Sequence, residues 1–295
     1  MKVGVVGYGN VGKALCTVIE QDKDLQLVGV FSRRKLTLSH YLPFDSLQDY
    51  RGKIDCLLIA LGSNVDVFEH AEKLRGFDTV DCFDNHAKID AYKSLMGKLN
   101  NKNLSIVATG WDPGLLSVCR ALFDFGNTPT TLWGEGVSQG HSNAIRTIPE
   151  VIDGVQFTIP IKNALELAKS GVTDVTKLHE RVCYVACVES AQQKVEREIK
   201  GMPYYFDGYQ TKVIFCTPQQ VRKLKQKTAH AGKVVSISQD FCCESTVKMQ
   251  NNAQFTAKIM LRYAKILPQL KRDGYVGAID VLDVPLRYLT NKNVL

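Results

Sequence analysis

The chain has 295 residues, of which 45% are hydrophobic and 23% charged, and 37 lysines and arginines against 30 aspartates and glutamates give a net charge of +7. This composition excludes a disordered tail protein and a small disulfide-stapled scaffold, and the length favours two domains. No apolar run reaches the roughly 20 residues of a membrane-spanning helix, and the first residues have no signal-peptide pattern. We therefore expect a cytoplasmic protein with no membrane partner.

Two cysteine patterns and one basic cluster could indicate a metal or a nucleic acid. Cys183 and Cys187, and the pair Cys242 and Cys243, have no second Cys or His pair at ligand spacing. The basic cluster at residues 222–227 lacks interleaved aromatic side chains, so a solvated helix face explains it better than a nucleic-acid site. We expect no metal, no nucleic-acid partner and no structural disulfide among the nine cysteines.

Short apolar runs alternate with helix-like stretches in the first third of the chain. This rhythm is typical of a parallel sheet covered on both faces. Residues 11–21 carry apolar side chains along one helical face and lie between the first two runs, which predicts a βαβ unit. The expected strands are residues 2–6, 25–31, 56–61, 79–83 and 104–108.

The middle of the chain has a different pattern, in which longer strand-like runs lie between helices and predict an α+β domain. A final helix follows, which Pro268 is expected to kink or end. The expected strands are residues 151–159, 181–188, 209–216, 233–238 and 277–284, and the helices are 163–169, 191–200 and 252–271. We predict an α/β protein: a Rossmann-type doubly wound parallel sheet in residues 1–114, completed by 253–295, and a second α+β domain in 115–252.

A glycine motif follows the first expected strand and opens the first helix, as Gly7-Tyr8-Gly9-Asn10-Val11-Gly12. The three glycines allow a tight turn, a close approach to a pyrophosphate and close packing of helix on strand. The helix N-terminus adds N–H groups and a positive dipole end for the phosphates. A glycine turn without a ligand is the alternative, but the position in a βαβ unit favours a dinucleotide.

The second expected strand ends in Ser32-Arg33-Arg34. An enzyme that uses NAD would have an acidic residue here for the ribose 2′-hydroxyl, whereas a hydroxyl and guanidinium groups suit a 2′-phosphate. Ordinary exposed loop charges are the alternative. We predict that the cofactor is NADP.

Two polar segments follow the fourth and fifth expected strands, where doubly wound sheets bind ligands. The first is Asp84-Asn85-His86, and the second is Gly110-Trp111-Asp112-Pro113-Gly114. Pro113 keeps Asp112 out of helical geometry and Gly114 frees the turn, so a carboxylate and an indole are presented at the sheet edge. Asp112 could instead only cap the helix expected at residues 115–125.

Taken together, these motifs resemble the meso-diaminopimelate dehydrogenase family over nearly the whole chain. The resemblance implies NADP-dependent oxidative deamination at the D-centre of meso-2,6-diaminopimelate, which gives L-2-amino-6-oxopimelate and ammonia. It also implies a homodimer, a role in bacterial lysine and cell-wall precursor metabolism, and a second domain that binds substrate and dimerises. The matching blocks are residues 7–12, 31–34, 84–86, 110–114, 138–142 and 202–203.

The resemblance also assigns site residues. The positions at the reacting end are Asp84, Trp111, Asp112, Trp133, Gln139 and Gly140. The positions that hold the distal L-centre are Thr158, Arg181, His230 and Asn252. The cofactor positions, besides the glycine motif and Ser32, Arg33 and Arg34, are Gly62, Ser63, Asp84 and Asn85.

Elementary chemistry agrees with this set, because two carboxylates and two ammonium groups need compensating charges at each end. Asp84 and Asp112 suit an ammonium, and Arg181 can bind a carboxylate with two hydrogen bonds. Asp112, or alternatively Asp84, would accept the proton of the substrate ammonium. Structural roles remain open for Thr158 as a strand residue, for Arg181 as a surface partner and for His230 as a core histidine.

Two other functions compete with this interpretation. Another NADP oxidoreductase of similar architecture, of the dihydrodipicolinate-reductase type or a broad D-amino acid dehydrogenase, would share the sheet and the glycine motif. A sensor that binds NADP without turnover would share them too, but it would not need two aspartates at the sheet edge.

Overall fold

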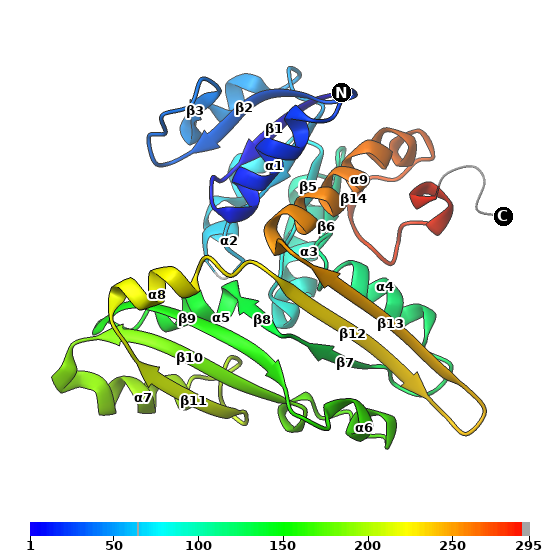
Figure 1. Ribbon diagram of the computed structural model, residues 1–295. Helices are drawn as coiled ribbons and strands as arrows, with labels where there is room; N and C mark the ends of the chain where they lie inside the picture. The colour runs from blue at the N-terminus through cyan, green and yellow to red at the C-terminus, as the bar shows by residue number, and fades with distance from the viewer. Residues whose placement is uncertain (64, 291–295) are drawn as a thin grey trace. The chain divides into compact units, whose positions relative to one another are not determined.

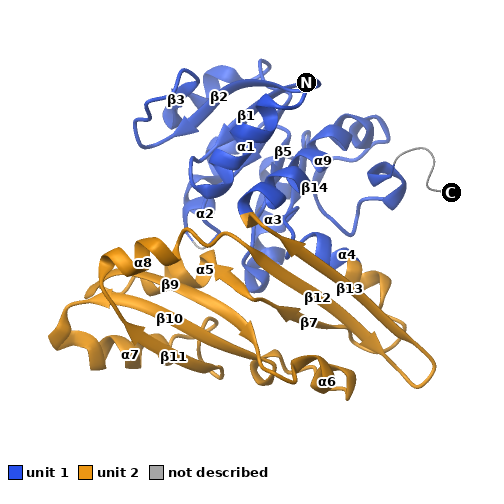
Figure 2. Cartoon of the chain, in the orientation of Figure 1, with its two compact units in different colours: residues 1–118, 253–295 blue, residues 119–252 orange. Residues whose placement is uncertain are grey.

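The computed structural model describes residues 1–63 and 65–290. The chain forms two compact units, drawn in two colours in Figure 2. Unit 1 comprises Met1–Val118 and Ala253–Leu295, and unit 2 comprises Cys119–Asn252. The first junction therefore falls within helix α4 (Leu115–Leu122). Among the described residues, no helix has the length and apolar character needed to cross a membrane.

Unit 1 contains a parallel sheet of seven strands in the order β14-β6-β5-β4-β1-β2-β3 (Figure 1). The strand order reverses on the two sides of β1, which is the topology of a Rossmann-type doubly wound sheet, so the predicted fold class is confirmed. The strands are β1 (Lys2–Val6), β2 (Gln26–Ser32), β3 (Tyr41–Pro43), β4 (Cys56–Ile59), β5 (Thr79–Asp81), β6 (Leu104–Val107) and β14 (Gly277–Asp280).

Helices cover both faces of this sheet. Because side chains alternate along a strand, Val3 and Val5 of β1 pack in one core, with α1 (Asn10–Glu20) and α9 (Asn252–Arg272). Val6 packs in the other core, with α3 (Ile89–Leu99). The shorter helices of the unit are α2 (Asp66–His70), η1 (Phe44–Tyr50), η2 (Ala71–Leu74), η3 (His86–Lys88) and η6 (Leu286–Leu289).

The last predicted helix, 252–271, is confirmed as α9 (Asn252–Arg272), with Pro268 inside it, so the proline does not end the helix. Other predicted elements have different ends in the structure. The expected strand 277–284 stops at Asp280, where the carboxylate of Asp280 accepts the amide of Leu282 and turns the chain. The expected helix 115–125 stops at Leu122, and the carboxylate of Asp124 accepts the amide of Gly126 in a turn beyond it.

Unit 2 contains two sheets, one of four strands in the order β11-β10-β9-β8 and one of three in the order β13-β12-β7. All of its neighbouring strands are antiparallel except β10 and β11. The strands are β7 (Thr130–Trp133), β8 (Gly136–Ser138), β9 (Val151–Pro160), β10 (His179–Cys187), β11 (Gln210–Phe215), β12 (His230–Ile237) and β13 (Cys242–Met249). The α+β prediction is therefore correct, although β7, β8 and β13 were not foreseen.

The helices of unit 2 pack on the four-stranded sheet and beside the smaller one. Val195 of α7 (Gln192–Lys200) and Ile145 of α5 (Gln139–Ile145) share a core with β10. Val221 of α8 (Pro218–Leu224) packs in a separate core with β9. Arg222 and Lys223 are exposed on α8, as expected for the basic cluster. The remaining helices are α6 (Ala164–Lys169), η4 (Val175–Lys177) and η5 (Glu189–Ala191).

Candidate functional site

The glycine motif forms the predicted turn between β1 and α1. Gly7 has a φ of 95°, and a Cβ there would lie 2.6 Å from the carbonyl oxygen of Ala60. A Cβ on Gly12 would clash with the carbonyl of Gly7, so this position requires glycine for the helix to pack on the turn. A Cβ on Gly9 would meet no atom within 4 Å, which leaves space for a ligand to approach the backbone. These properties fit the pyrophosphate of a dinucleotide.

The segment at the end of β2 presents two exposed arginines. The amide of Arg34 donates to Oγ of Ser32 at 3.1 Å, which holds the start of the loop. The guanidinium of Arg33 contacts Oδ1 of Asp66 at 2.8 Å and Nε2 of His70 at 2.9 Å. Asp66 and His70 also belong to the one trio of possible metal ligands that lie together among the described residues, but both already contact this guanidinium.

The residues after β4 and β5 are in contact at the sheet edge. The amide of Asp84 donates to Oγ of Ser63 at 3.0 Å, so the predicted cofactor positions Gly62 and Ser63 lie beside Asp84 and Asn85. The side chain of Asp84 is exposed, yet desolvation by the surrounding protein raises the pKa of its carboxyl group. Solvent screens part of this effect at an exposed group.

The segment after β6 makes a tight turn that presents Asp112. A Cβ on Gly114 would clash with the carbonyl of Gly110, so only glycine fits there. The side chain of Asp112 is 2% exposed, and its Oδ2 lies 3.9 Å from Nε2 of His86. The amides of Leu115 and Leu116 donate to backbone carbonyls at the start of the turn, so these two amides of α4 do not need the Asp112 side chain as a cap. Within unit 1, the turn therefore lies beside the Asp84-Asn85-His86 segment.

Arg181 and Thr158 face each other across neighbouring strands of unit 2. Nη1 of Arg181 donates to Oγ1 of Thr158, and the guanidinium lies over the ring of Tyr209 at 4.1 Å. Arg181 is only 6% exposed, so it is not the surface partner that was considered as an alternative. Its Nε has no hydrogen-bond partner, and no carboxylate of the described residues forms an ion pair with it. A buried cation in this state suits an anionic ligand.

Trp133 and His230 lie in the same part of unit 2. The amide of Trp133 donates to Nε2 of His179 at 2.8 Å, and Nδ1 of His179 donates to the carbonyl of Val175 at 2.8 Å. His230 is buried against Gly136, where a Cβ would clash with its ring, and Gly136 pairs with Thr158 across β8 and β9. The structure therefore brings Thr158, Arg181 and His230 together around β9.

Gln139, Gly140 and Asn252 lie at helix starts. Gln139 and Gly140 open α5, and a Cβ on Gly140 would meet no atom within 4 Å. Ser142 anchors this helix, because its hydroxyl accepts the amide of Gln156 on β9 at 2.9 Å. Asn252 is the first residue of α9, and its amide donates to the carbonyl of Thr228.

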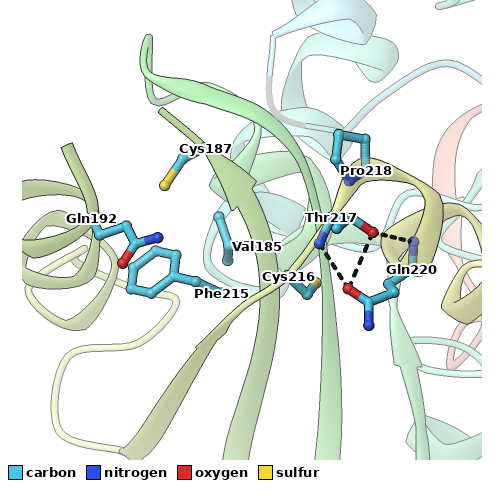
Figure 3. Close-up of a pocket in the computed structure, with 8 residues that line it drawn as sticks. All are labelled: Val185, Cys187, Gln192, Phe215, Cys216, Thr217, Pro218 and Gln220. Carbon is cyan, nitrogen blue, oxygen red and sulfur yellow. Dashed lines mark hydrogen bonds between the residues drawn. The ribbon is translucent and has the colours of Figure 1, made fainter. Parts of the chain in front are cut away.

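A separate hollow of about 450 Å³ lies on unit 2 and is shown in Figure 3. It contains none of the predicted site residues, and its lining has no charged side chain. A molecule with two carboxylates and two ammonium groups would need charged partners, so this hollow does not suit it. The lining consists of Val185, Cys187, Gln192, Phe215, Cys216, Thr217, Pro218 and Gln220.

Comparison with known proteins shows which family the chain resembles. Residues 110–255 match the diaminopimelic acid dehydrogenase C-terminal domain. A meso-diaminopimelate D-dehydrogenase of Acetivibrio thermocellus is 36% identical over 99% of this chain and 95% of its own length. The chain belongs to the meso-diaminopimelate D-dehydrogenase family.

Solved structures of the diaminopimelate dehydrogenase type have the same fold. The DAP dehydrogenase of C. glutamicum in complex with DAP is 32% identical, with a TM-score of 0.92 over 100% of this chain and 97% of that chain. An engineered D-amino acid dehydrogenase bound to NADP+ is 31% identical, with a TM-score of 0.90 over the same shares.

The sequence analysis did not single out His179, which contacts Trp133, or Tyr209, which contacts Arg181. A signal for His179 existed, because residues two apart on a strand share a face and His179 precedes Arg181 on β10 by two positions. No signal existed for Tyr209, which comes from outside β10 and reaches the guanidinium only in the folded chain.

Burial of His179 predicts that acid destabilises the protein. Burial lowers the pKa of this imidazole to about 4, so between pH 6.5 and pH 4 the unfolded chain binds a proton that the folded chain does not. The free energy of unfolding should therefore decrease as the pH falls through this range, by up to about 1.4 kcal/mol per pH unit for one fully linked group. Urea titrations followed by tryptophan fluorescence at several pH values measure it.

The variant His179→Gln should show a shallower pH dependence, whereas His40→Gln, an exposed histidine, should match the wild type. Equal slopes in the wild type and His179→Gln would mean that other groups cause the acid sensitivity.

Proposed function

We propose that this chain catalyses the reversible NADP-dependent oxidative deamination of the D-centre of meso-2,6-diaminopimelate to L-2-amino-6-oxopimelate and ammonia. The observation that carries the proposal is the buried Arg181, bonded to Thr158 and stacked on Tyr209, with an unbonded Nε and no carboxylate partner among the described residues. A substrate with a carboxylate at its far end supplies that missing partner. The DAP that is bound to the C. glutamicum enzyme supports the same substrate.

The distal L-centre would be held by unit 2. Arg181 offers a planar guanidinium to the distal carboxylate, and Thr158, His230 and Asn252 supply hydrogen-bonding groups for this end. Binding energy from this remote end can orient the D-centre for reaction. We assign Trp111, Trp133, Gln139 and Gly140 to the reacting end, where they would limit the access of water to the substrate.

The reacting ammonium would be held by the aspartates of unit 1. The carboxylate of Asp112 accepts a proton from the ammonium, which frees the nitrogen lone pair, and Asp84 orients the group or takes this role in its place. Hydride loss leaves an iminium ion, and the protonated carboxyl group of Asp112 would orient the water that adds to its carbon. When the resulting carbinolamine collapses, the C=O bond forms and the C–N bond breaks; one water proton goes to solvent, and the other leaves with the nitrogen, together with the proton held by Asp112, as ammonium. Two carboxylates at this end also balance the positive charge of the substrate.

NADP would be held by the glycine turn and the β2 segment. The open space at Gly9 accommodates a pyrophosphate, and Ser32, Arg33 and Arg34 suit a 2′-phosphate. We assign Tyr8, Asn10, Val11, Gly62, Ser63, Asp84 and Asn85 to the same cofactor site. When bound, NADP+ supplies the acceptor for the hydride that leaves the substrate. The NADP+ in the related engineered D-amino acid dehydrogenase supports this choice of cofactor.

An absorbance assay at the NADPH band tests the proposed function. NADP+ is supplied with meso-, LL- or DD-diaminopimelate, or with D-alanine, in separate reactions. We expect turnover with the meso isomer and little with LL-diaminopimelate, which has no D-centre. Equal turnover with D-alanine would indicate a broad D-amino acid dehydrogenase, and NADPH binding without any turnover would indicate a sensor.

The cofactor assignment makes its own prediction. The double variant Arg33→Ala/Arg34→Ala should weaken NADP binding by roughly a hundredfold and NAD binding only slightly, because each charge-assisted hydrogen bond contributes roughly 1.5–3 kcal/mol. Fluorescence titration with NADPH and NADH measures both affinities. Lys35→Ala, which removes the next exposed charge of the loop, is the control and should change little. Equal loss of both cofactors would contradict a specific 2′-phosphate site.

We also propose that the chain is a cytoplasmic homodimer and that unit 2 is its substrate-binding and dimerisation domain. The support is the resemblance to the family and its biosynthetic role. Light scattering after size exclusion should give twice the chain mass of 32.9 kDa. A mass of one chain at working concentration would contradict the dimer.

A further inference from the structure

The chain segments that follow the neighbouring strands β5 and β6 both form hydrogen bonds with Asp81. It is the last residue of β5, and it is 2% exposed. Its Oδ1 accepts the amides of Phe83 at 3.0 Å and Ala108 at 2.8 Å. Its backbone carbonyl accepts the amide of Thr109 at 2.8 Å and the hydroxyl of Thr109 at 2.7 Å. One buried residue therefore binds the segment after β5 and the segment after β6 at the same time.

These are the two segments that carry the aspartates of the reacting end. Asp84 directly follows Phe83, and Asp112 lies three positions after Thr109. Ala108 has a φ of 57°, a left-handed conformation that residues with a side chain rarely adopt and that costs free energy. The bond from its amide to Asp81 holds this conformation as the chain leaves β6. The separation of the two segments is thus fixed through Asp81.

Packing alone does not account for an aspartate at this position. No cation of the described residues forms an ion pair with Asp81, and burial raises the pKa of its carboxyl group to about 6. Its Oδ2 interacts with the hydroxyl of the buried Tyr92, which offsets part of the rise in the pKa of Asp81 and adds to the rise in the pKa of Tyr92, but neither atom has a hydrogen bond of good geometry. Because a buried unsatisfied polar group costs stability, an apolar residue would fill the space at a lower cost. An apolar residue would, however, lose the two hydrogen bonds that Oδ1 accepts from backbone amides.

We propose that Asp81 is a positioning residue of the reacting end, which sets the position of Asp84 relative to Asp112 by holding the amides of Phe83 and Ala108. This inference rests on the proposed function, because it gives Asp84 and Asp112 their roles. Asp81 acts through these two residues and does not itself touch the substrate.

Two substitutions of Asp81 distinguish the effect of its hydrogen bonds from the effect of the space that its side chain fills. Asp81→Asn keeps one oxygen that can accept both amides, whereas Asp81→Leu keeps the branched shape, with the same number of side-chain heavy atoms, and has no acceptor. We expect Asp81→Leu to lower kcat about thirtyfold or more, because a small misplacement of reacting groups is enough for such a loss. KM for meso-diaminopimelate and the NADPH dissociation constant should change much less than kcat, because the distal residues of unit 2, the glycine turn and the β2 segment are untouched, and only Asp84 and Asn85 of the cofactor positions follow the segment that Asp81 holds. Asp81→Asn should restore kcat to within about threefold of the wild type.

Thr79→Val is the matched control. Thr79 is buried on the same strand, and its Oγ1 has no hydrogen-bond partner, so valine removes a buried polar atom without touching either segment. We expect wild-type kcat from this variant. A loss of kcat in Thr79→Val similar to that in Asp81→Leu would mean that any disturbance of β5 suffices, which would overturn the proposal.

Amide hydrogen exchange provides a readout that needs no substrate. The amides of Phe83, Ala108 and Thr109 should exchange faster in Asp81→Leu than in the wild type, Asp81→Asn or Thr79→Val. If the wild type does not turn over meso-diaminopimelate, the proposed function is wrong, and the exchange result still decides whether Asp81 holds the two segments. Unchanged exchange in folded Asp81→Leu, or unchanged kcat, would overturn the proposal.

Should Asp81→Leu fail to fold, Thr109→Val gives a milder test. It removes only the hydroxyl bond to the carbonyl of Asp81 and keeps the size of the side chain. We expect kcat to fall about threefold to tenfold with unchanged NADPH affinity, as for a partial loss of positioning. Wild-type kcat in this variant would contradict the role of Asp81.

Discussion

Arg181→Lys is expected to lower kcat/KM for meso-diaminopimelate about a hundredfold, while the dissociation constant of NADPH stays unchanged. The guanidinium is planar, donates to Thr158 and lies over the ring of Tyr209 at 4.1 Å. An ammonium is not planar and cannot donate two parallel hydrogen bonds to a carboxylate. Lysine therefore keeps the positive charge but loses the bidentate interaction. Arg181→Ala should be worse, because the distal carboxylate would then be buried without any cation.

The loss should appear in kcat as well as in KM. If remote binding energy orients the D-centre, then a substrate held loosely at its L-centre spends less time in a reactive pose. Steady-state kinetics with meso-diaminopimelate and fluorescence titration with NADPH distinguish the two parameters. Arg222→Lys, on the exposed side of α8, is the matched control for an arginine-to-lysine change. Near wild-type kinetics in both Arg181 variants would place the distal binding site elsewhere, and loss of NADPH affinity would indicate misfolding.

Much of unit 1 could be predicted from the sequence because its signals are local. The expected strand 2–6 coincides with β1, and the four other expected strands of that region begin within one residue of β2, β4, β5 and β6. Helix α3 was missed although Tyr92, Met96 and Leu99 are buried at helical spacing, so the signal was present and was not used. The edge strand β13 was also missed: its residues alternate between exposed and less exposed, with Cys243, Val247 and Met249 on the less exposed face, but Cys242 and Ser245 interrupt the apolar alternation in the sequence.

The site was predictable as a set of residues but not as a set of contacts. Motifs and family resemblance give the identity of Arg181 and Asp112, since these depend on residue type and order. The stacking of Tyr209 on Arg181 and the bonds from two segments to Asp81 depend on strand register and on turns that only the folded chain defines. The contacts of Arg33 with Asp66 and His70 were equally unpredictable from the sequence, because these residues are more than thirty positions apart in the chain.

The other large effect is expected at the reacting end. Asp112→Asn should lower kcat by about a hundredfold to ten-thousandfold with nearly unchanged NADPH affinity, the range typical of a lost general base. The side chain of Asp112 is 2% exposed and lies 3.9 Å from His86, so asparagine fits the same space and removes only the ability to take a proton. Asp84→Asn is expected to act in the same direction through the alternative acceptor.

Comparison of the two variants assigns the proton acceptor. The acceptor is the aspartate whose replacement removes the acid limb of the pH profile of kcat/KM, because that limb reports the protonation of the free enzyme's base. The other aspartate should lower the rate without changing the shape of the profile, as a group that only orients the ammonium would. Asp90→Asn, an exposed carboxylate at the start of α3, is the control and should leave both the rate and the profile unchanged. Wild-type turnover in Asp112→Asn would reduce Asp112 to a structural residue of the turn and make Asp84 the remaining candidate.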